Sequence, residues 1–94
     1  MAEKLSDDLI EAKLTELDGW SLADGKLERE FKFRNFVQAF AFMTAAAMEA
    51  EKMNHHPEWF NVYNKVRVQL MTHEADGITA LDFELAGRMN RLAA

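Results

Sequence analysis

The dipeptide Asp24-Gly25 lies between two short segments of strand-forming residues, and it limits the folds open to this chain more than any other feature. Aspartate and glycine tolerate the positive φ values of a tight type I′ turn, which joins two antiparallel strands. The second segment, residues 26–33, alternates apolar and charged side chains, so one strand face should be buried and the other exposed to water. We therefore predict a β-hairpin over residues 20–33. Arg29 interrupts the alternation and suggests a sheet edge.

N-capping signals place helices before, between and after the strands. The long middle helix should end near residues 54–55, because Pro57 disfavours helical geometry at the residue before it. Apolar residues recur at helical spacing in the middle and last helices. The expected caps are Ser6, Asn35 with Gln38, and Thr79 with Asp82; the expected buried stripes are Phe36, Phe40, Met43, Ala47 and Ala50, and Leu81, Leu85, Met89 and Leu92.

A second pair of strands follows Pro57, over residues 60–63 and 66–72, with a turn near Asn64-Lys65. The order of elements is then α-β-β-α-β-β-α. Hairpins that alternate with helices are typical of a two-layer α+β domain. We predict one domain over residues 1–94, in which helices pack on one face of a four-stranded antiparallel sheet.

Composition excludes several classes of function. The chain has no cysteine, which rules out disulfides and thiolate nucleophiles and suits a reducing compartment such as the cytoplasm. The N-terminus has early acids and no apolar signal region, and the apolar tract at residues 36–50 is shorter than a membrane span. The net charge is -5 and basic residues are scattered. We therefore expect a cytoplasmic protein that contacts neither membranes nor nucleic acid directly.

The three histidines, His55, His56 and His73, all fall at the ends of predicted elements. An imidazole changes charge near neutral pH, so this placement suits general acid and base chemistry. Glu51 precedes His55 by four residues and would share its helix face, where the carboxylate could fix the orientation of the ring. An ordinary solvated pair is the alternative interpretation of this spacing.

Other kinds of site are less well supported. The histidines lack the HExxH and H-x(3-5)-H spacings of zinc sites, so no metal is expected. No serine lies in a Gly-x-Ser-x-Gly elbow, and the glycines form no phosphate-binding loop. Trp20 and Trp59 begin predicted strands, where they either pack in the core or offer a flat wall to a planar heterocycle. Asp82 is explained by the capping box alone.

Taken together, Glu51, His55-His56-Pro57, Trp59, His73 and Asp82 resemble the signature of the pterin-4a-carbinolamine dehydratases, through the segments EKMNHHPEWFNVYNKV and THEADGIT. The segment Leu17-Asp18-Gly19-Trp20 resembles the first strand of that family. The resemblance implies removal of water from a 4a-hydroxytetrahydropterin to give the quinonoid dihydropterin, in tetrahydropterin recycling and without a cofactor.

The resemblance also implies roles for single residues. His55, His56 and His73 would be catalytic, with His55 and His73 as the acid/base pair and His56 orienting the pterin. Glu51 would support His55, and which histidine is the acid stays open. The pocket wall and its hydrogen bonds would come from Trp20, Pro57, Trp59 and Asp82.

Members of this family form dimers or tetramers, and in animals one also binds a homeodomain transcription factor. The resemblance therefore implies a homodimer or homotetramer and leaves a protein partner open. The alternative function is a non-catalytic protein-binding module on the same fold. Such a module has no need for Glu51 together with the three histidines, so their joint presence favours the enzyme.

Overall fold

The Asp24-Gly25 dipeptide forms the predicted hairpin in the computed structural model, which describes residues 2–94. Both residues have positive φ values, 53° and 76°, and Ala23 pairs with Lys26 across the turn. The order of elements agrees with the prediction, apart from an added 3-10 turn. The elements are α1 (Asp7–Leu14), β1 (Ser21–Ala23), β2 (Lys26–Lys32), α2 (Phe36–Met53), β3 (Glu58–Val62), β4 (Lys65–Leu70), η1 (His73–Ala75) and α3 (Ala80–Ala93).

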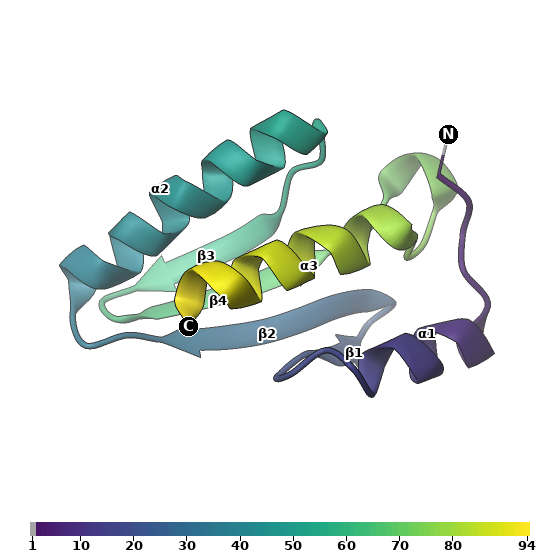
Figure 1. Ribbon diagram of the computed structural model, residues 1–94, viewed down its shortest axis with the longest axis horizontal. Coiled ribbons are helices and arrows are strands. Elements are labelled where there is room, and N and C mark those ends of the chain that lie inside the picture. The colour runs from purple at the N-terminus through teal and green to yellow at the C-terminus, as the bar shows by residue number, and fades with distance from the viewer. Residues whose placement is uncertain (1) are drawn as a thin grey trace.

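The four strands form one antiparallel sheet in the order β1-β2-β4-β3. Figure 1 shows α2 and α3 side by side over one face of this sheet. The predicted two-layer α+β class is therefore confirmed. The end of α2, the start of β3 and the 3-10 turn after β4 lie toward the same end of the molecule (Figure 1), where the histidines are.

The core lies between the sheet and the two long helices. Alternate residues of β4 are buried, while those between them face away, which is the pattern of a sheet covered on one side. The buried apolar residues of these elements are Leu27 and Phe31 on β2, Val66, Val68 and Leu70 on β4, Ala39, Phe42, Ala46 and Ala50 on α2, and Leu85, Ala86 and Met89 on α3.

Arg29 does not mark a sheet edge, and that prediction is wrong. β2 lies inside the sheet, between β1 and β4. Arg29 lies two residues from each of the buried residues Leu27 and Phe31, so it shares their helix-covered face. Its guanidinium lies 4.3 Å from the centre of the Phe31 ring and donates to the Asp18 carbonyl and the Asn90 side chain. The charge of Arg29 on the covered face is therefore satisfied by Asn90 of α3 and by the Asp18 carbonyl before β1.

The buried stripe of each long helix differs from the predicted one. On α2 the stripe is built mainly from alanines, whose size lets the helix approach the sheet, while Phe36 and Phe40 remain about half exposed. Because α2 is apolar almost all round, periodicity alone does not indicate which face turns inward. On α3, Asp82 joins Leu85 and Met89 in the buried stripe, and Leu92 is exposed.

The turn of the second hairpin lies one residue earlier than predicted, at Tyr63-Asn64, because Val62 pairs with Lys65. Tyr63 has a positive φ of 49°. This register keeps the β-branched residues of β4 on the helix-covered face. Within residues 2–94, no helix is long and apolar enough to cross a membrane.

Candidate active site

His55 is the buried histidine, and its partner is Asp82 at the start of α3. The His55 Nε2 atom lies 2.6 Å from Asp82 Oδ1. Asp82 is fully buried and His55 is only 8% exposed. A carboxylate only accepts hydrogen bonds, so this contact places a proton on Nε2 of the imidazole.

The end of α2 directs His55 toward Asp82. Asn54 adopts the left-handed conformation, with φ 51° and ψ 42°, and its N–H bonds the carbonyls of Ala50 and Glu51. The His55 N–H also bonds the Ala50 carbonyl, at 3.0 Å. These contacts form a Schellman motif with asparagine in place of the usual glycine. The chain therefore leaves the helix before His55 and turns its ring toward α3.

The predicted pairing of Glu51 with His55 is wrong for this reason. It assumed that α2 continues through residue 55, whereas the helix ends at Met53. Glu51 contacts His56 instead, with 2.9 Å between Oε1 and Nε2. Both of these side chains are exposed. Pro57 then separates His56 from the start of β3.

Two threonines complete the surroundings of the Asp82 carboxylate. Asp82 Oδ2 accepts hydrogen bonds from the Thr72 hydroxyl at 2.9 Å and from the Thr79 backbone N–H at 2.8 Å. Because the Thr72 proton goes to Asp82, the Thr79 hydroxyl donates to Thr72 Oγ1, at 2.7 Å. Thr79 also caps α3 by accepting from the Leu81 N–H. The predicted capping box is confirmed, and Asp82 additionally orients His55.

His73 faces a third carboxylate, which sequence reasoning missed. It begins the 3-10 turn after β4, and its Nε2 lies 3.4 Å from Oε2 of Glu58. The other oxygen of Glu58 accepts a 2.7 Å hydrogen bond from Lys26. This hydrogen bond lowers the pKa of Glu58 below its ordinary value of 4.5, with a smaller contribution from the charge of His73. Each of the three imidazoles therefore contacts its own carboxylate through Nε2.

The three histidines line one small cavity. Its volume is about 150 Å³, and its lining residues come from the end of α2, the end of β4 and the 3-10 turn. A second hollow of about 230 Å³ adjoins it, shares His55 with it and is also lined by Thr72. The lining residues of the first cavity are Asn54, His55, His56, Met71, His73 and Glu74.

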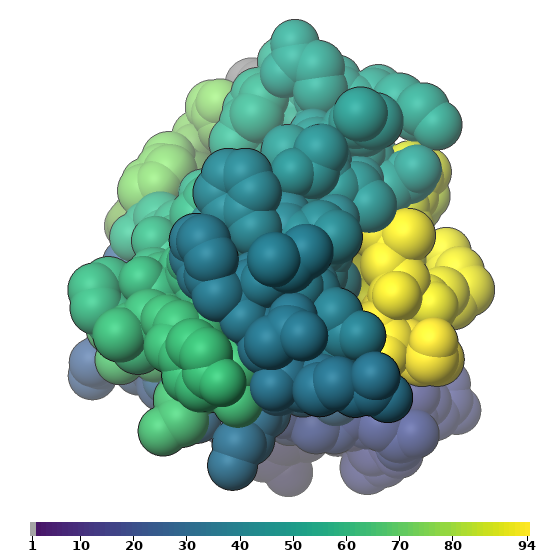
Figure 2. All heavy atoms as spheres, turned by 90° about the vertical axis from the view of Figure 1, so that its left-hand side faces the viewer, coloured from purple at the N-terminus to yellow at the C-terminus, as the bar shows by residue number. Residues whose placement is uncertain are grey.

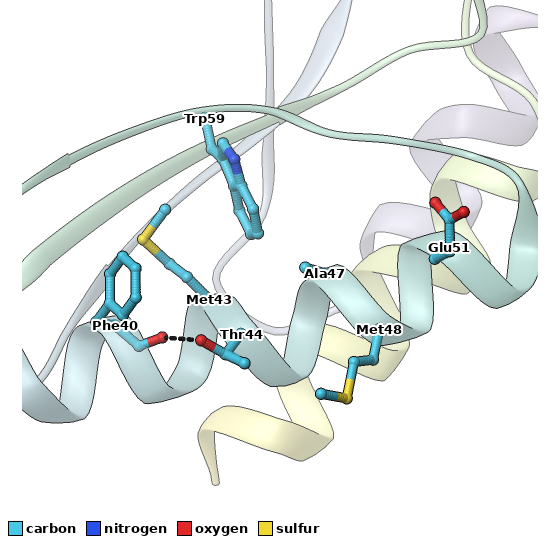
Figure 3. A pocket seen from close by; sticks show the side chains of 7 residues that line it. All are labelled: Phe40, Met43, Thr44, Ala47, Met48, Glu51 and Trp59. Carbon is cyan, nitrogen blue, oxygen red and sulfur yellow. Dashed lines mark hydrogen bonds between the residues drawn. The ribbon is translucent and has the colours of Figure 1, made fainter.

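A larger hollow of about 430 Å³ lies between α2 and β3 and contains no histidine. Figure 3 shows Trp59 pointing from β3 toward α2, with Glu51 at one end of the row of α2 side chains and Phe40 at the other. Trp59 therefore lines this apolar groove and not the histidine cavity, contrary to the expected wall. The groove and the cavity are linked through Glu51, which contacts His56.

Trp20 is not near the histidines, and its predicted place in the pocket wall is wrong. It is 6% exposed, packs edge-on against Phe31 and donates to the Asn90 side chain at 2.8 Å. Asn90 follows Asp82 by eight residues on α3, a rise of about 12 Å. Trp20 thus belongs to the core at the far end of that helix, as its packing interpretation predicted.

Glu58 and Lys26 could have been found from the predicted strands, had their register been known. Both lie on the sheet face without helices, and strand alternation predicts that face. Their meeting depends on the order β2-β4-β3, which no motif in the sequence encodes.

Among residues 2–94, no three histidine or acidic side chains are grouped to hold a metal ion. The arrangement offers three imidazoles for proton transfer and hydrogen bonding.

Comparisons with known proteins point to one family. The profile of the family described as pterin 4 alpha carbinolamine dehydratase matches residues 3–92. A relative from Solibacter usitatus is 55% identical over 94 residues, covering 100% of this chain and 99% of its own. One from Mesorhizobium japonicum is 61% identical over 90 residues, covering 94% of this chain and 92% of its own. Both are named as candidate pterin-4-alpha-carbinolamine dehydratases.

A solved structure is similar over the whole fold. The crystal structure of a transcriptional coactivator/pterin dehydratase from Brucella melitensis matches with a TM-score of 0.95 and 47% sequence identity. The match covers 98% of this chain and 100% of the other. At this level of identity, the similarity extends beyond the arrangement of helices and strands.

Proposed function

Because the chain belongs to the pterin 4 alpha carbinolamine dehydratase family, we propose that it removes water from a 4a-hydroxytetrahydropterin to give the quinonoid dihydropterin. This makes it a hydro-lyase in tetrahydropterin recycling, acting as a single domain over residues 1–94. The observation that carries the proposal is that three imidazoles line one cavity, each against its own carboxylate.

The reaction needs one acid and one base. An imidazolium gives its proton to the 4a-hydroxyl, the carbon–oxygen bond breaks, and water leaves. A neutral imidazole accepts the proton of a ring nitrogen, whose electron pair forms the new carbon–nitrogen double bond. No electrons are gained or lost overall, so two histidines are sufficient for the proton transfers.

The roles follow from the family resemblance and the local contacts. His55 and His73 form the acid/base pair, and His56 binds and orients the pterin. Asp82 holds the His55 ring in one orientation, while Glu51 does the same for His56, in place of its expected role at His55.

Turnover of a 4a-hydroxytetrahydropterin, followed by stopped flow, tests this function. The wild-type rate should exceed the uncatalysed rate. The turnover rate of His73→Ala should be lower than that of wild type by ~100-fold to 10,000-fold, the usual contribution of a positioned acid or base. His55→Ala should lose as much, with circular dichroism to verify its fold. Glu30→Ala, at an exposed site on β2, is the matched control and should retain full activity. A wild-type rate equal to the uncatalysed rate would refute the enzyme.

We also propose that the chain forms a homodimer or homotetramer through α2 and β3. Large apolar side chains are exposed at the start of α2 and along β3, and residues 2–94 contain no strand paired with the outer edge of β3. Figure 2 looks onto this end of the molecule, with α2 in the centre of the face and the β3–β4 hairpin beside it. An open strand edge and an apolar helix face support association. The exposed residues are Phe36, Val37, Phe40, Met48, Phe60, Val62 and Tyr63.

Sedimentation tests the assembly. Wild type at micromolar concentration should sediment as a multiple of 10.8 kDa. Phe40→Asp should shift the distribution toward smaller species, because Phe40 is 54% exposed in the proposed interface. Leu22→Asp, at a residue 51% exposed on β1, should leave the assembly unchanged. A monomeric wild type would refute this part.

The same surface supports a second candidate function, a protein-binding module. The Brucella melitensis structure is that of a transcriptional coactivator/pterin dehydratase, so both functions are attached to a close structural relative. Absence of turnover in the wild type would favour this candidate. Loss of turnover in His73→Ala, with assembly intact, would favour the enzyme.

A further inference from the structure

Glu58 connects two side chains that come from other parts of the chain. Its Oε1 accepts a 2.7 Å hydrogen bond from Lys26 Nζ at the start of β2. Its Oε2 lies 3.4 Å from Nε2 of His73, which begins the 3-10 turn after β4. One carboxylate oxygen therefore faces a lysine and the other faces an imidazole.

The sheet register brings these residues together. Glu58 is the first residue of β3 and pairs with Gln69 of β4, which also pairs with Glu28 of β2. Lys26 lies two residues before Glu28, so it shares the sheet face without helices. Because β4 separates β2 from β3, the Lys26 side chain crosses β4 to reach Glu58. The lysine and His73 therefore contact different oxygens of the same carboxylate.

The charge of Glu58 determines which nitrogen of His73 can carry a proton in that contact. The hydrogen bond from Lys26 lowers the pKa of Glu58, so the group is a carboxylate at neutral pH. A carboxylate has only acceptor oxygens, so the nitrogen facing it must carry a proton. In the neutral imidazole, Nδ1 is then left with the free lone pair.

The other titratable groups of the cavity do not face His73 from another element in the way that Glu58 does. Glu74 lines the same cavity but belongs to the same 3-10 turn as His73. The two other imidazoles of the cavity, His55 and His56, contact carboxylates of their own. Glu58 is thus the acid that faces His73 from another element.

We propose that Glu58 is a positioning residue for His73, which it holds over the histidine cavity with the proton on Nε2 and with Nδ1 free to exchange a proton with the substrate. This inference rests on the proposed function. Lys26 acts one step further away, by holding Glu58. The contact of 3.4 Å is long, and such contacts often shorten only when the substrate is bound.

An ordinary surface ion pair is the competing interpretation, because Glu58 is 42% exposed and His73 is 74% exposed. Exposed pairs typically contribute little to stability. The two interpretations differ in what they predict for the imidazole. A surface pair leaves its tautomer and the turnover number unaffected, whereas a positioning residue changes both.

The test combines a spectroscopic and a kinetic measurement on Glu58→Ala. In the wild type, the ¹⁵N shifts of the neutral His73 ring should report one tautomer, protonated on Nε2. In Glu58→Ala, the two ring shifts should move toward each other as both tautomers become populated. The kcat should fall by roughly tenfold with KM little changed, a smaller loss than the ~100-fold or more expected for removing the histidine itself.

Two matched variants sharpen the result. Glu58→Gln keeps an acceptor oxygen without the charge, so its tautomer and kcat should lie between those of wild type and Glu58→Ala. Glu30→Ala removes a glutamate from the same sheet face on β2 and should behave as wild type.

The outcomes separate this inference from the proposed function. Unchanged His73 shifts and unchanged kcat in Glu58→Ala would overturn the inference while the dehydratase stands. If the wild type does not dehydrate the pterin, the proposed function fails. The ring shifts alone then decide whether Glu58 positions His73. Unchanged shifts then overturn the positioning of His73, and altered shifts support it.

Discussion

The buried and the exposed halves of the histidine cavity use the same contact in different settings. In the buried half, His55 and Asp82 have side chains that are 9% and 0% exposed. In the exposed half, His56 is 57% exposed and contacts Glu51, and His73 is 74% exposed and faces Glu58. An imidazole–carboxylate contact is therefore built into the core at one end and held in solvent at the other.

This difference in burial indicates which of the imidazole–carboxylate contacts the stability of the fold depends on. A buried carboxylate is costly unless it is hydrogen-bonded, and Asp82 has three donors. Among residues 2–94, no buried side-chain nitrogen or oxygen lacks a partner. Exposed pairs can exchange their partner for water at little cost. The buried half is thus fixed by the fold, while the exposed half is free to adjust.

The largest expected difference concerns stability. Asp82→Ala removes the acceptor of three buried donors and should lower the free energy of unfolding by about 3–5 kcal/mol, as for other broken buried pairs. Glu51→Ala removes the partner of an exposed histidine and should cost no more than about 1 kcal/mol. Urea unfolding at one fixed protein concentration measures both. Equal losses in the two variants would contradict the division into a buried and an exposed half.

A second variant tests whether a partly buried polar cluster far from the histidines is needed for activity. Asn90→Ala removes the acceptor of Trp20 Nε1–H and of Arg29, at the end of α3 away from the histidines. It should lower the free energy of unfolding by about 1–3 kcal/mol, because the buried Trp20 N–H and the partly buried Arg29 lose their acceptor. The dehydration rate per folded molecule should equal that of wild type. A large loss of activity at full folding would instead connect Trp20 to the site.

The sequence was sufficient for the fold because its local signals agree. The Asp24-Gly25 turn, the caps of α2 and α3 and the stop before Pro57 all point to one order of elements. It was insufficient for the helix faces, because α2 carries apolar residues almost all round. There the small alanines face inward, since they let the helix approach the sheet, and the larger phenylalanines at positions 36 and 40 remain outside.

The site was predictable in its members and less so in its pairs. The pattern of helices and strands placed the three histidines at element ends, and the family resemblance implied that they share a pocket, whose lining the structure gives. Their partners depend on geometry that spacing does not give. The left-handed conformation of Asn54 ends α2 before His55, so Glu51 contacts His56 instead of His55. The strand order β2-β4-β3 brings Lys26 to Glu58. The capping signal explains Asp82 from the residues alone, so only the family resemblance indicated a second role, and its contact with His55 depends on the fold.

The smallest expected effect tests the exposed half through the titration of Glu58. Lys26 is the largest cause of its lowered pKa, so Lys26→Met should raise the pKa of Glu58 toward 4.5. NMR of the side-chain carboxyl carbon as a function of pH measures it. The contact from Lys26 stabilises the folded state fully above the unfolded-state pKa, and this contribution is lost as pH falls through the lower folded-state pKa.

The wild type should therefore keep the ionised Glu58 to a lower pH than Lys26→Met, with the difference confined to the acid range below 4.5. His73 also lowers the pKa of Glu58 through its charge, so part of the shift should persist in the variant. Lys65→Met, at the opposite end of β4, is the control and should leave the titration unchanged. Coincident curves for wild type and Lys26→Met would show that solvent screens the Lys26–Glu58 contact completely. In that case Lys26 would have no part in holding Glu58 against His73.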